Sequence, residues 1–340
     1  MSLIIRCDVG KEIGLGHYYR CTILKKAFEK NGKHAFLVLK YLDEGECPLP
    51  YDLLVEGSYK NEIAKYAFEG KNIILDMFHY KSRSDREFKK YIVDLQKNNN
   101  KIAFIEGLED EACPSHFYPY LDVLITPYIC STLYKKHPNH FFGEDFLIMD
   151  VSRVVNKKNI KKIAKNILIT FGGSDPWNQT NWVLNAFKKE NCFNNVQIKV
   201  VIGPLMTKNQ IKEIQQYERE FKEVHLLCAP QDLKDYFEWA DLAITNSGNT
   251  RYELAASGVP CIIVPFNVMG HTLSKIFLEL NVADLEQNFQ NLDESVLVDH
   301  LFKNLNSYEK RLSMSNSGKK YFYKPTGTDN LIKNLIKVWQ

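Results

Sequence analysis

The feature that most limits the fold of this chain is an alternation of short apolar runs with helical patterns. The first series contains the runs LIIRCD, HAFLVLK, NIILDM, KIAFIEG and DVLITPY, with a helical pattern over residues 16–31 after the first of them. Around residues 152–166 the sequence becomes polar and lysine-rich, which is typical of a solvated linker or helix face. Strands that alternate with helices form βαβ units around a parallel sheet.

The same alternation then starts again at NILITFGGSD. It continues through VQIKVVIGP, EVHLLCAP, DLAITNSG and PCIIVPF, with helices predicted at 232–239 and 250–257 and an amphipathic helical pattern from about 296 onward. Each series opens with a strand followed by a glycine-rich turn. The sequence therefore predicts two Rossmann-like α/β domains, 1–155 and 156–340, with the boundary near residues 150–165.

Bulk properties narrow the class of protein. The net charge of +3 over 340 residues includes no dense basic block, so a nucleic-acid partner is not expected. The start MSLIIRCDVG lacks the pattern of a signal peptide, and no apolar run approaches the roughly 18 residues of a membrane span. We expect a cytoplasmic protein without stable membrane insertion, while binding to a membrane surface and the oligomeric state stay open.

The cysteines and carboxylates bear on metal binding. The eight cysteines show no CxxC spacing, which favours reduced, buried thiols over a structural zinc site. The sequence also contains no DxD-type pair and no compact carboxylate or His/Cys cluster. We therefore expect no metal and no cofactor, with helix N-termini supplying positive charge to an anion instead.

The first motif is IGLGHYYRC, which follows a predicted strand and opens a predicted helix. Gly14 and Gly16 allow a tight turn and the close approach of a ligand to the backbone. The turn places His17 at the carboxyl end of a strand, where a neutral imidazole can act as a general base. An isolated histidine would be interpreted as a capping or packing residue, but the Gly-x-Gly frame favours the functional interpretation.

The second motif, TFGGSDPWN, also follows a predicted strand. Gly172 and Gly173 permit a phosphate or sugar to approach, and Ser174 is a candidate cap for the next helix. Taken alone, this sequence is equally typical of a plain βα turn.

The third motif runs from strand DLAIT into a loop and a helix that Gly258 ends. Backbone N–H groups and small side chains there predict a cradle for a diphosphate, formed by Ser247, Gly248, Asn249 and Thr250. Glu253 lies one turn into the helix, where a carboxylate can accept both ribose hydroxyls of a nucleotide. The alternative is that Glu253 is a favourable charge in a first helical turn.

The fourth motif, PFNVMGHTLSK, is predicted to be a loop after a strand. This loop would carry Asn267 and His271 toward a ligand-binding cleft shared with the other motifs. Ordinary loop polarity explains both residues equally well.

These motifs carry a family resemblance. The pattern R-x-D-x4-I-G-x-G-H-x2-R, which begins at Arg6 and ends at Arg20, resembles the signature of the UDP-sugar hydrolases of pseudaminic acid biosynthesis and their spore-coat polysaccharide relatives. The GGSD sequence, Glu253 and Asn267 fit the same group. The second half is also similar to the N-acetylglucosamine transferase of peptidoglycan synthesis, and the cradle NSGNTRYE is closer to that of transferases.

The resemblance implies a GT-B architecture, with two facing Rossmann-like domains, a UDP-sugar in the cleft between them, and a last helix near 328–340 that crosses back to the first domain. It implies that His17 activates a water molecule that attacks the anomeric carbon, releasing UDP with inversion and without a metal. It further implies that Asp8 and Asn267 are catalytic neighbours and that Arg20 belongs to the substrate site.

Three functions remain open from the sequence. The first is hydrolysis of a UDP-linked 2,4-diacetamido-2,4,6-trideoxyhexose. The second is metal-independent glycosyl transfer from a UDP-sugar in surface polysaccharide biosynthesis. The third is a non-catalytic nucleotide-sugar sensor, which would keep the cradle but have no use for a glycine-framed histidine.

Overall fold

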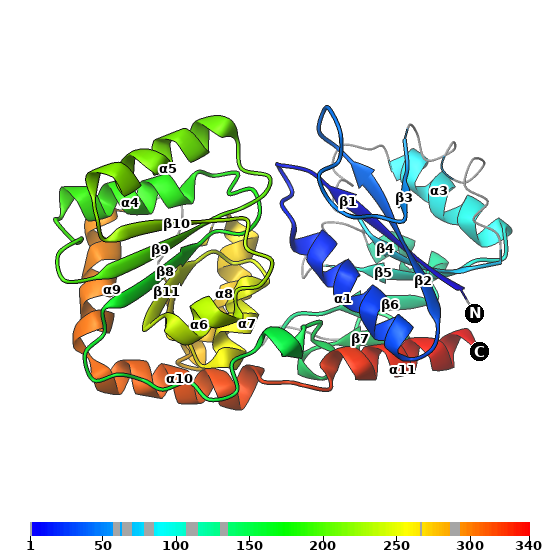
Figure 1. Ribbon diagram of the computed structural model, residues 1–340. Helices are drawn as coiled ribbons and strands as arrows, with labels where there is room; N and C mark the ends of the chain where they lie inside the picture. Colours follow the sequence, from blue (N-terminus) through cyan, green and yellow to red (C-terminus); the bar gives the residue numbers. More distant parts are fainter. Residues whose placement is uncertain are drawn as a thin grey trace. The chain divides into compact units, whose positions relative to one another are not determined.

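The structure is a computed structural model that consists of two α/β units. It describes residues 2–56, 62, 70–77, 85–106, 115–129, 135–265, 267–285 and 293–340. Unit 1 comprises residues 1–149 and 325–340, and unit 2 comprises residues 150–324 (Figure 1). The C-terminal helix packs within unit 1.

Unit 1 is built on a parallel sheet whose described strands number seven. Their spatial order is β3 (Leu53–Leu54), β2 (His34–Tyr41), β1 (Ser2–Val9), β4 (Asn72–Asp76), β5 (Lys101–Ile105), β6 (Val123–Thr126) and β7 (His140–Phe142). The chain runs from β1 outward to β3 and then returns to the other side of β1 for β4. The strand order therefore reverses between β1 and β4, and this switch point is where open α/β sheets bind ligands, at the carboxyl ends of the strands.

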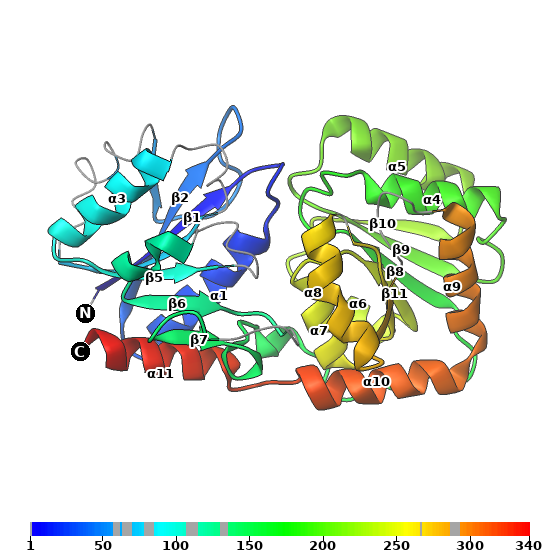
Figure 2. The same cartoon turned by 180° about the vertical axis from the view of Figure 1, so that it is seen from behind.

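Helices cover both faces of this sheet (Figures 1 and 2). On one face α1 (Gly16–Lys30) packs beside α11 (Gly327–Trp339), and the rings of Phe28 and Trp339 lie 6.4 Å apart. On the other face α3 (Asp85–Lys97) buries Phe88, Ile92 and other apolar residues against the strands. Short 3₁₀ turns occupy Ser115–Tyr120 and Glu144–Phe146.

Unit 2 is likewise built on a parallel sheet, with six described strands. Their order is β10 (Val224–Cys228), β9 (Gln197–Ile202), β8 (Asn166–Thr170), β11 (Leu242–Thr245), β12 (Cys261–Ile263) and β13 (Ala283–Leu285). Here the order reverses between β8 and β11. The loops of the second and third sequence motifs follow these two strands and thus meet at the switch point.

The helices of unit 2 again form two layers. One face of the sheet is covered by α4 (Gln179–Lys189), α5 (Lys208–Glu220) and α9 (Glu294–Asn306), whose apolar side chains share a core with the strands. On the other face lie α6 (Lys234–Trp239), α7 (Thr250–Ser257), α8 (Val268–Glu279) and α10 (Tyr308–Phe322). Aromatic contacts join these helices: Phe277 of α8 stacks on Phe322 of α10 at 4.4 Å.

The lysine-rich segment before β8 is more than a solvated linker. A 3₁₀ turn over Val151–Arg153 precedes it, and the Lys158 ammonium donates to the carbonyl oxygens of Phe237 at 2.9 Å and of Glu238 at 2.6 Å, at the C-terminal end of α6. Burial lowers the pKa of Lys158 to about 8. Arg311 of α10 donates to the carbonyl oxygen of Lys161 at 2.8 Å. This segment is therefore fixed along the helices of unit 2.

Other sequence expectations have mixed outcomes. The predicted helices at 232–239 and 250–257 are confirmed by α6 and α7. Of the six described cysteines, none is in a disulfide and four are buried, whereas Cys228 is exposed; Cys113 and Cys130 lie outside the described residues.

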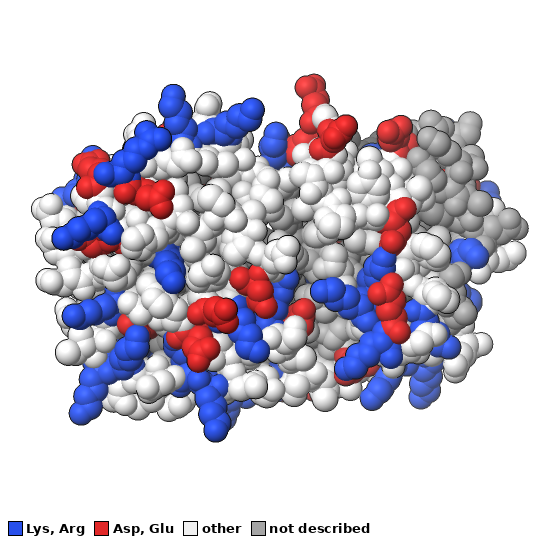
Figure 3. Space-filling view, viewed as in Figure 1, with Lys and Arg blue, Asp and Glu red and all other residues white. Residues whose placement is uncertain are grey.

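Within the described ranges no helix has the length and apolar character to cross a bilayer. On the face shown in Figure 3, basic and acidic side chains are interspersed.

Candidate active site

The chemistry-bearing residues of unit 1 gather at the switch point between β1 and β4. Asp8 is near the end of β1, and Asp76 is the last residue of β4. The turn after β1 closes when the Gly14 N–H donates to the Gly10 carbonyl at 2.9 Å, with Gly14 at a φ of 73° that favours glycine. Helix α1 then begins at Gly16, so His17 lies in its first turn.

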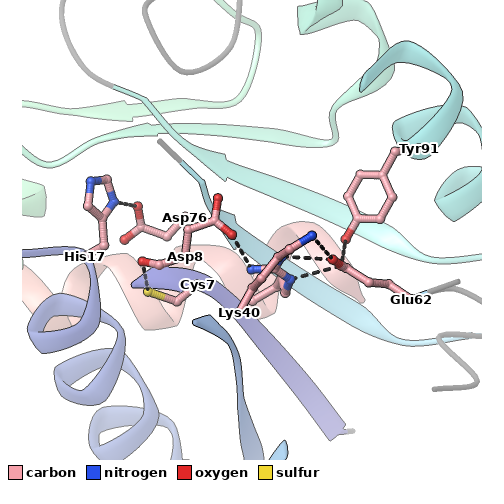
Figure 4. Close-up of polar contacts among 8 residues, drawn as sticks. Cys7, Asp8, His17, Lys40, Glu62, Asp76 and Tyr91 are labelled. Atoms are coloured by element: carbon pink, nitrogen blue, oxygen red, sulfur yellow. Dashed lines mark hydrogen bonds and ion pairs between the residues drawn. The ribbon is translucent and has the colours of Figure 1, made fainter. Parts of the chain in front are cut away.

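His17, Asp76 and Arg20 form one hydrogen-bonded cluster. Nδ1 of His17 lies 2.5 Å from Oδ1 of Asp76 (Figure 4). The Arg20 guanidinium donates to both Asp76 oxygens, Nε to Oδ2 and Nη2 to Oδ1, each at 2.5 Å. Asp76 is fully buried, while the His17 side chain keeps 14% of its surface exposed. The imidazole is thus the member of the cluster that a substrate can reach.

The charge state of Asp76 follows from its partners. Burial by itself would raise the pKa of the Asp76 carboxyl, but Arg20 and then His17 hold that pKa well below its usual range. An ionised Asp76 can only accept a hydrogen bond, so the short contact requires His17 to donate from Nδ1. Nε2 then carries the lone pair that a general base needs.

A second buried ion cluster lies beside the first. Asp8 is fully buried and accepts from Nη1 of Arg6 at 2.8 Å, and Arg6 in turn donates to both oxygens of Glu62 at 3.0 Å (Figure 4). Lys40 and Tyr91 also contact Glu62, at 3.5 and 3.4 Å. Asp8 is thus a buried member of an ion cluster rather than an exposed group, and its implied role next to the sugar stays a prediction.

In unit 2, one amide side chain joins the two loops at the switch point. Nδ2 of Asn246 donates to the carbonyl oxygen of Phe171 at 2.9 Å, and its Oδ1 accepts from the Gly248 N–H at 2.8 Å. The glycine loop turns at Gly172, whose φ is 82°. Asn246 therefore fixes the loop after β8 against the loop after β11.

The capping role expected for Ser174 belongs to its neighbour. The Asp175 carboxylate accepts from the N–H groups of Gln179 and Thr180, both at 2.8 Å, and so caps α4. The expectation for Ser174 is wrong because the carboxylate can accept two N–H groups at once. Ser174 is instead buried, and its hydroxyl has no hydrogen-bond partner among the described residues.

A third loop, the turn after β9, packs against the glycine loop, which is the loop after β8 that contains Gly172 and Gly173. The turn after β9 lies so close that a Cβ atom at Gly203 would meet the carbonyl oxygens of Gly173 at 2.3 Å and Gly172 at 2.5 Å. The Leu205 N–H donates to the Gly173 carbonyl at 2.8 Å. Only glycine fits at position 203 without moving the loop.

Helix α7 follows the loop after β11. It begins at Thr250 with Asn249 at its N-cap position and ends at Gly258, as predicted, with Gly258 at a φ of 69°. The Ser247 hydroxyl is buried and, within the described residues, has no hydrogen-bond partner. Buried hydroxyls such as this one are normally satisfied by protein, water or ligand.

Glu253 lies in the first turn of α7. Burial raises the pKa of its carboxyl to about 7; Arg153 opposes this rise, whereas Asp150 and Asp232 add to it. Glu253 therefore titrates near neutral pH, unlike an exposed glutamate.

The fourth motif is a helix rather than a loop. The Asn267 side chain accepts from the Gly270 N–H at 2.6 Å and caps α8, so the loop predicted here is wrong. His271 lies within the first turns of this helix, and burial lowers its pKa, as does the nearby Lys275. A Cβ at Gly270 would lie 2.6 Å from the Ser247 hydroxyl oxygen, which places the start of α8 directly against the cradle loop.

Each predicted site residue therefore lies at the switch point of its own sheet or on an adjoining helix. Unit 1 carries Asp8, Gly14, Gly16, His17 and Arg20, and unit 2 carries residues 172–174, 247–250, Glu253, Asn267 and His271. Asp76 and Gly203 were not predicted from the sequence as site residues, and Asn246 was placed in the cradle segment without its role of joining the two loops. The sequence held a signal for each role. Asp76 follows an apolar run, Asn246 directly precedes the cradle residues, and Gly203 is followed by a proline at the end of a predicted strand. In the parts of the chain that the structure describes, no three or more metal-ligating side chains gather.

The fold defined by these two units is the α/β GT-B class, as solved structures show. MurG of Acinetobacter baumannii superposes with a TM-score of 0.62 over 99% of each chain at 13% identity. A Staphylococcus aureus MnaA–UDP co-structure gives 0.61 at 14% identity, over 99% of this chain and 98% of that one.

Residues 166–319, nearly all of unit 2, match the Glycosyltransferase family 28 C-terminal domain. Protein MJ1062 of Methanocaldococcus jannaschii is 27% identical over 282 residues, which are 78% of this chain and 55% of that protein.

Two further relatives have descriptive names. The pseudaminic acid cytidylyltransferase and UDP-2,4-diacetamido-2,4,6-trideoxy-beta-L-altropyranose hydrolase of Helicobacter pylori is 26% identical over 86% of this chain and 51% of that protein. Spore coat polysaccharide biosynthesis protein SpsG of Bacillus subtilis is 23% identical over 94% of this chain and 93% of that protein. The chain spans about half the length of the archaeal and Helicobacter proteins.

Proposed function

We propose that this protein is a metal-independent GT-B enzyme that transfers a glycosyl group from a UDP-sugar to an acceptor hydroxyl in surface polysaccharide biosynthesis. The observation that carries the proposal is the match of residues 166–319 to the Glycosyltransferase family 28 C-terminal domain. That range includes both loops at the switch point of unit 2 and the first turn of α7.

Unit 2 is proposed to hold the nucleotide. The diphosphate is assigned to the backbone and hydroxyls of Gly173, Ser174, Ser247, Gly248 and Thr250. Two observations support this assignment: the buried hydroxyls of Ser174 and Ser247 have no partner among the described residues, and the N-terminal end of α7 attracts negative charge. The assignment of the ribose to Glu253 rests on the position of its carboxylate in the first turn of that helix.

Unit 1 is proposed to supply the general base. Nε2 of His17 takes the proton of the acceptor hydroxyl as its oxygen forms a bond to the anomeric carbon of the sugar. The bond from that carbon to the diphosphate oxygen breaks, and its electron pair leaves with UDP, so the configuration at the carbon inverts. The ionised Asp76 stabilises the imidazolium that forms, which is the role an aspartate plays behind a catalytic histidine.

Hydrolysis is the second candidate, with water in place of the acceptor and the same transfer of proton and electron pair. It is favoured by the Helicobacter relative, whose name includes a UDP-sugar hydrolase and whose similarity extends over 86% of this chain. The matching substrate is a UDP-linked 2,4-diacetamido-2,4,6-trideoxyhexose. The pattern from Arg6 to Arg20 lies in unit 1, outside the family-28 match, and supports this alternative.

An assay of UDP release separates the two candidates. The protein is incubated with a panel of UDP-sugars, each with and without saccharide and lipid acceptors, and the sugar products are identified by NMR. Transfer predicts UDP release that requires an acceptor and a product with inverted linkage. Release at the same rate in buffer alone, with free sugar as product, would establish hydrolysis. Absence of UDP release and of UDP binding across the panel would refute both.

A further inference from the structure

We propose that Arg20 is a positioning residue that keeps the proton of the His17 ring on Nδ1 by occupying both oxygens of Asp76. The inference deepens the proposed function, since it rests on His17 as the base. It assigns Arg20 to the protein side of the site rather than to the substrate. Arg20 is itself 5% exposed and lies one helical turn after His17 on α1.

The fork of the guanidinium fits the carboxylate. Nε and Nη2 each lie 2.5 Å from a different oxygen of Asp76, a bidentate pair that fixes the plane of the carboxylate. The Cys21 thiol also donates to Oδ2, at 3.4 Å. Burial raises the pKa of Cys21 well above its ordinary value, so this thiol remains a donor. With these contacts in place, Oδ1 has one fixed position, and there it meets Nδ1 of His17.

Loss of Arg20 would reverse the direction of the His17 hydrogen bond. The His17 ring also lowers the pKa of Asp76, but Arg20 lowers it more, and burial of the carboxyl acts in the opposite direction. Without Arg20 we therefore expect burial to favour the neutral carboxyl, since burial disfavours the charge. A neutral Asp76 would carry a hydroxyl that donates to Nδ1. The ring proton would then have to lie on Nε2, and Nε2 could no longer accept a proton from an acceptor hydroxyl. Arg20 thus controls the base without contact with the substrate.

The other groups that the structure describes around the pair do not replace Arg20. Nη2 of Arg20 also lies 2.9 Å from Nδ1 of His17, but it offers only donors and so cannot take the ring proton. Tyr128 accepts from Nη1 of Arg20 and holds the outer end of the guanidinium. On β1, Cys7 is buried and Asp8 is paired with Arg6. Apart from the His17 ring itself, Arg20 is the cation that the described residues place on the oxygens of Asp76.

The test compares Arg20→Gln, Arg20→Lys and wild type in the full chain. The ¹⁵N chemical shifts of the His17 ring distinguish a protonated from an unprotonated nitrogen in the free protein, and His17→Asn identifies its signals among those of nine histidines. In wild type the proton is expected on Nδ1. In Arg20→Gln it is expected to move to Nε2, and kcat to fall about 10²- to 10⁴-fold with the donor KM nearly unchanged.

Arg20→Lys keeps the charge but loses the planar fork that fixes the carboxylate, so the ring proton is expected to stay on Nδ1 and kcat to be intermediate. Arg219→Gln, the same change on the exposed face of α5, is the matched control and should leave the His17 signals unchanged. Because the NMR measurement needs no turnover, it tests the inference even if no UDP-sugar is a substrate. A wild-type proton position in Arg20→Gln, or in Arg20→Met if the glutamine variant does not fold, would overturn the proposal, because both variants remove the cation.

Discussion

Oδ1 of Asp76 lies 2.5 Å from Nδ1 of His17, although 59 residues separate the two along the chain. The contact exists because β1 and β4 are neighbours in the sheet, with Cys7 paired to Asp76 in register. If Asp76 orients and stabilises the His17 ring, Asp76→Asn should lower kcat by about 10²-fold or more while UDP affinity is kept. Steady-state kinetics and calorimetry with UDP would measure the two quantities.

The same substitution has a structural cost that must be separated from the catalytic one. Removing the charge leaves the buried Arg20 without its ion-pair partner, which destabilises proteins by about 3–5 kcal/mol. Activity should therefore be measured well below the melting temperature of the variant. A folded Asp76→Asn protein with wild-type kcat would contradict the role of Asp76.

His17 itself gives the most direct prediction. His17→Leu should lower kcat by about 10²- to 10⁴-fold, because positioned proton transfer contributes that much. UDP affinity should change little, since the proposed nucleotide contacts belong to unit 2. A purely structural histidine predicts instead that melting temperature and activity fall together. Turnover, UDP affinity and melting temperature of this one variant decide between the two, and wild-type turnover would end the proposal of a base.

The fold was predictable where local sequence carries the signal. Strands buried on both faces are continuous apolar runs, and NIILDM and NILIT stand out for that reason. The edge strands β3, β7 and β13 have only two or three residues, and their pairing depends on neighbours that a local pattern does not contain. For the same reason the sequence indicated His17 by its glycine frame but gave no partner for it.

Helix α8 was not predicted from the sequence, because one of its residues is determined by a tertiary contact and not by helix propensity. The sequence PFNVMGHTLSK was interpreted as a loop, and it includes a glycine at position 270, which is unfavourable in a helix interior. The structure explains the glycine, since a Cβ there would lie 2.6 Å from the Ser247 oxygen. Asn267 was the missed signal, because asparagine is among the strongest N-cap residues.

Nucleotide affinity should depend on pH through Glu253, whose pKa burial raises to about 7. If its carboxylate accepts the ribose hydroxyls, affinity should rise as the pH increases through about 7 and the group becomes ionised. Glu253→Gln should bind UDP more weakly at pH 8 and lose this component of the pH dependence. Phosphate groups also titrate near pH 6, so the difference between wild type and variant from pH 6 to 8 is the quantity to measure. Equal profiles would refute the assignment to ribose.

Turnover should not require a divalent metal. The proposed site stabilises the leaving diphosphate with backbone N–H groups and the N-terminal end of α7. Treatment with EDTA followed by gel filtration should leave kcat unchanged, and added magnesium or manganese should not raise it. Loss of turnover after EDTA that either ion restores would show that the cation supplies this charge.

The last prediction concerns the support of the glycine loop. In Gly203→Ala the new Cβ would lie 2.3 Å from the Gly173 carbonyl oxygen and 2.5 Å from that of Gly172, so the loop after β8 must move. We expect UDP affinity to fall by about tenfold or more, equivalent to about 1.4 kcal/mol of lost binding free energy. Gly32→Ala is the matched control, because Gly32 has a φ of 68° and open space around its Cβ position. The control should lower the melting temperature through backbone strain and leave UDP affinity intact. Unchanged affinity in Gly203→Ala would show that the position of the glycine loop does not govern nucleotide binding.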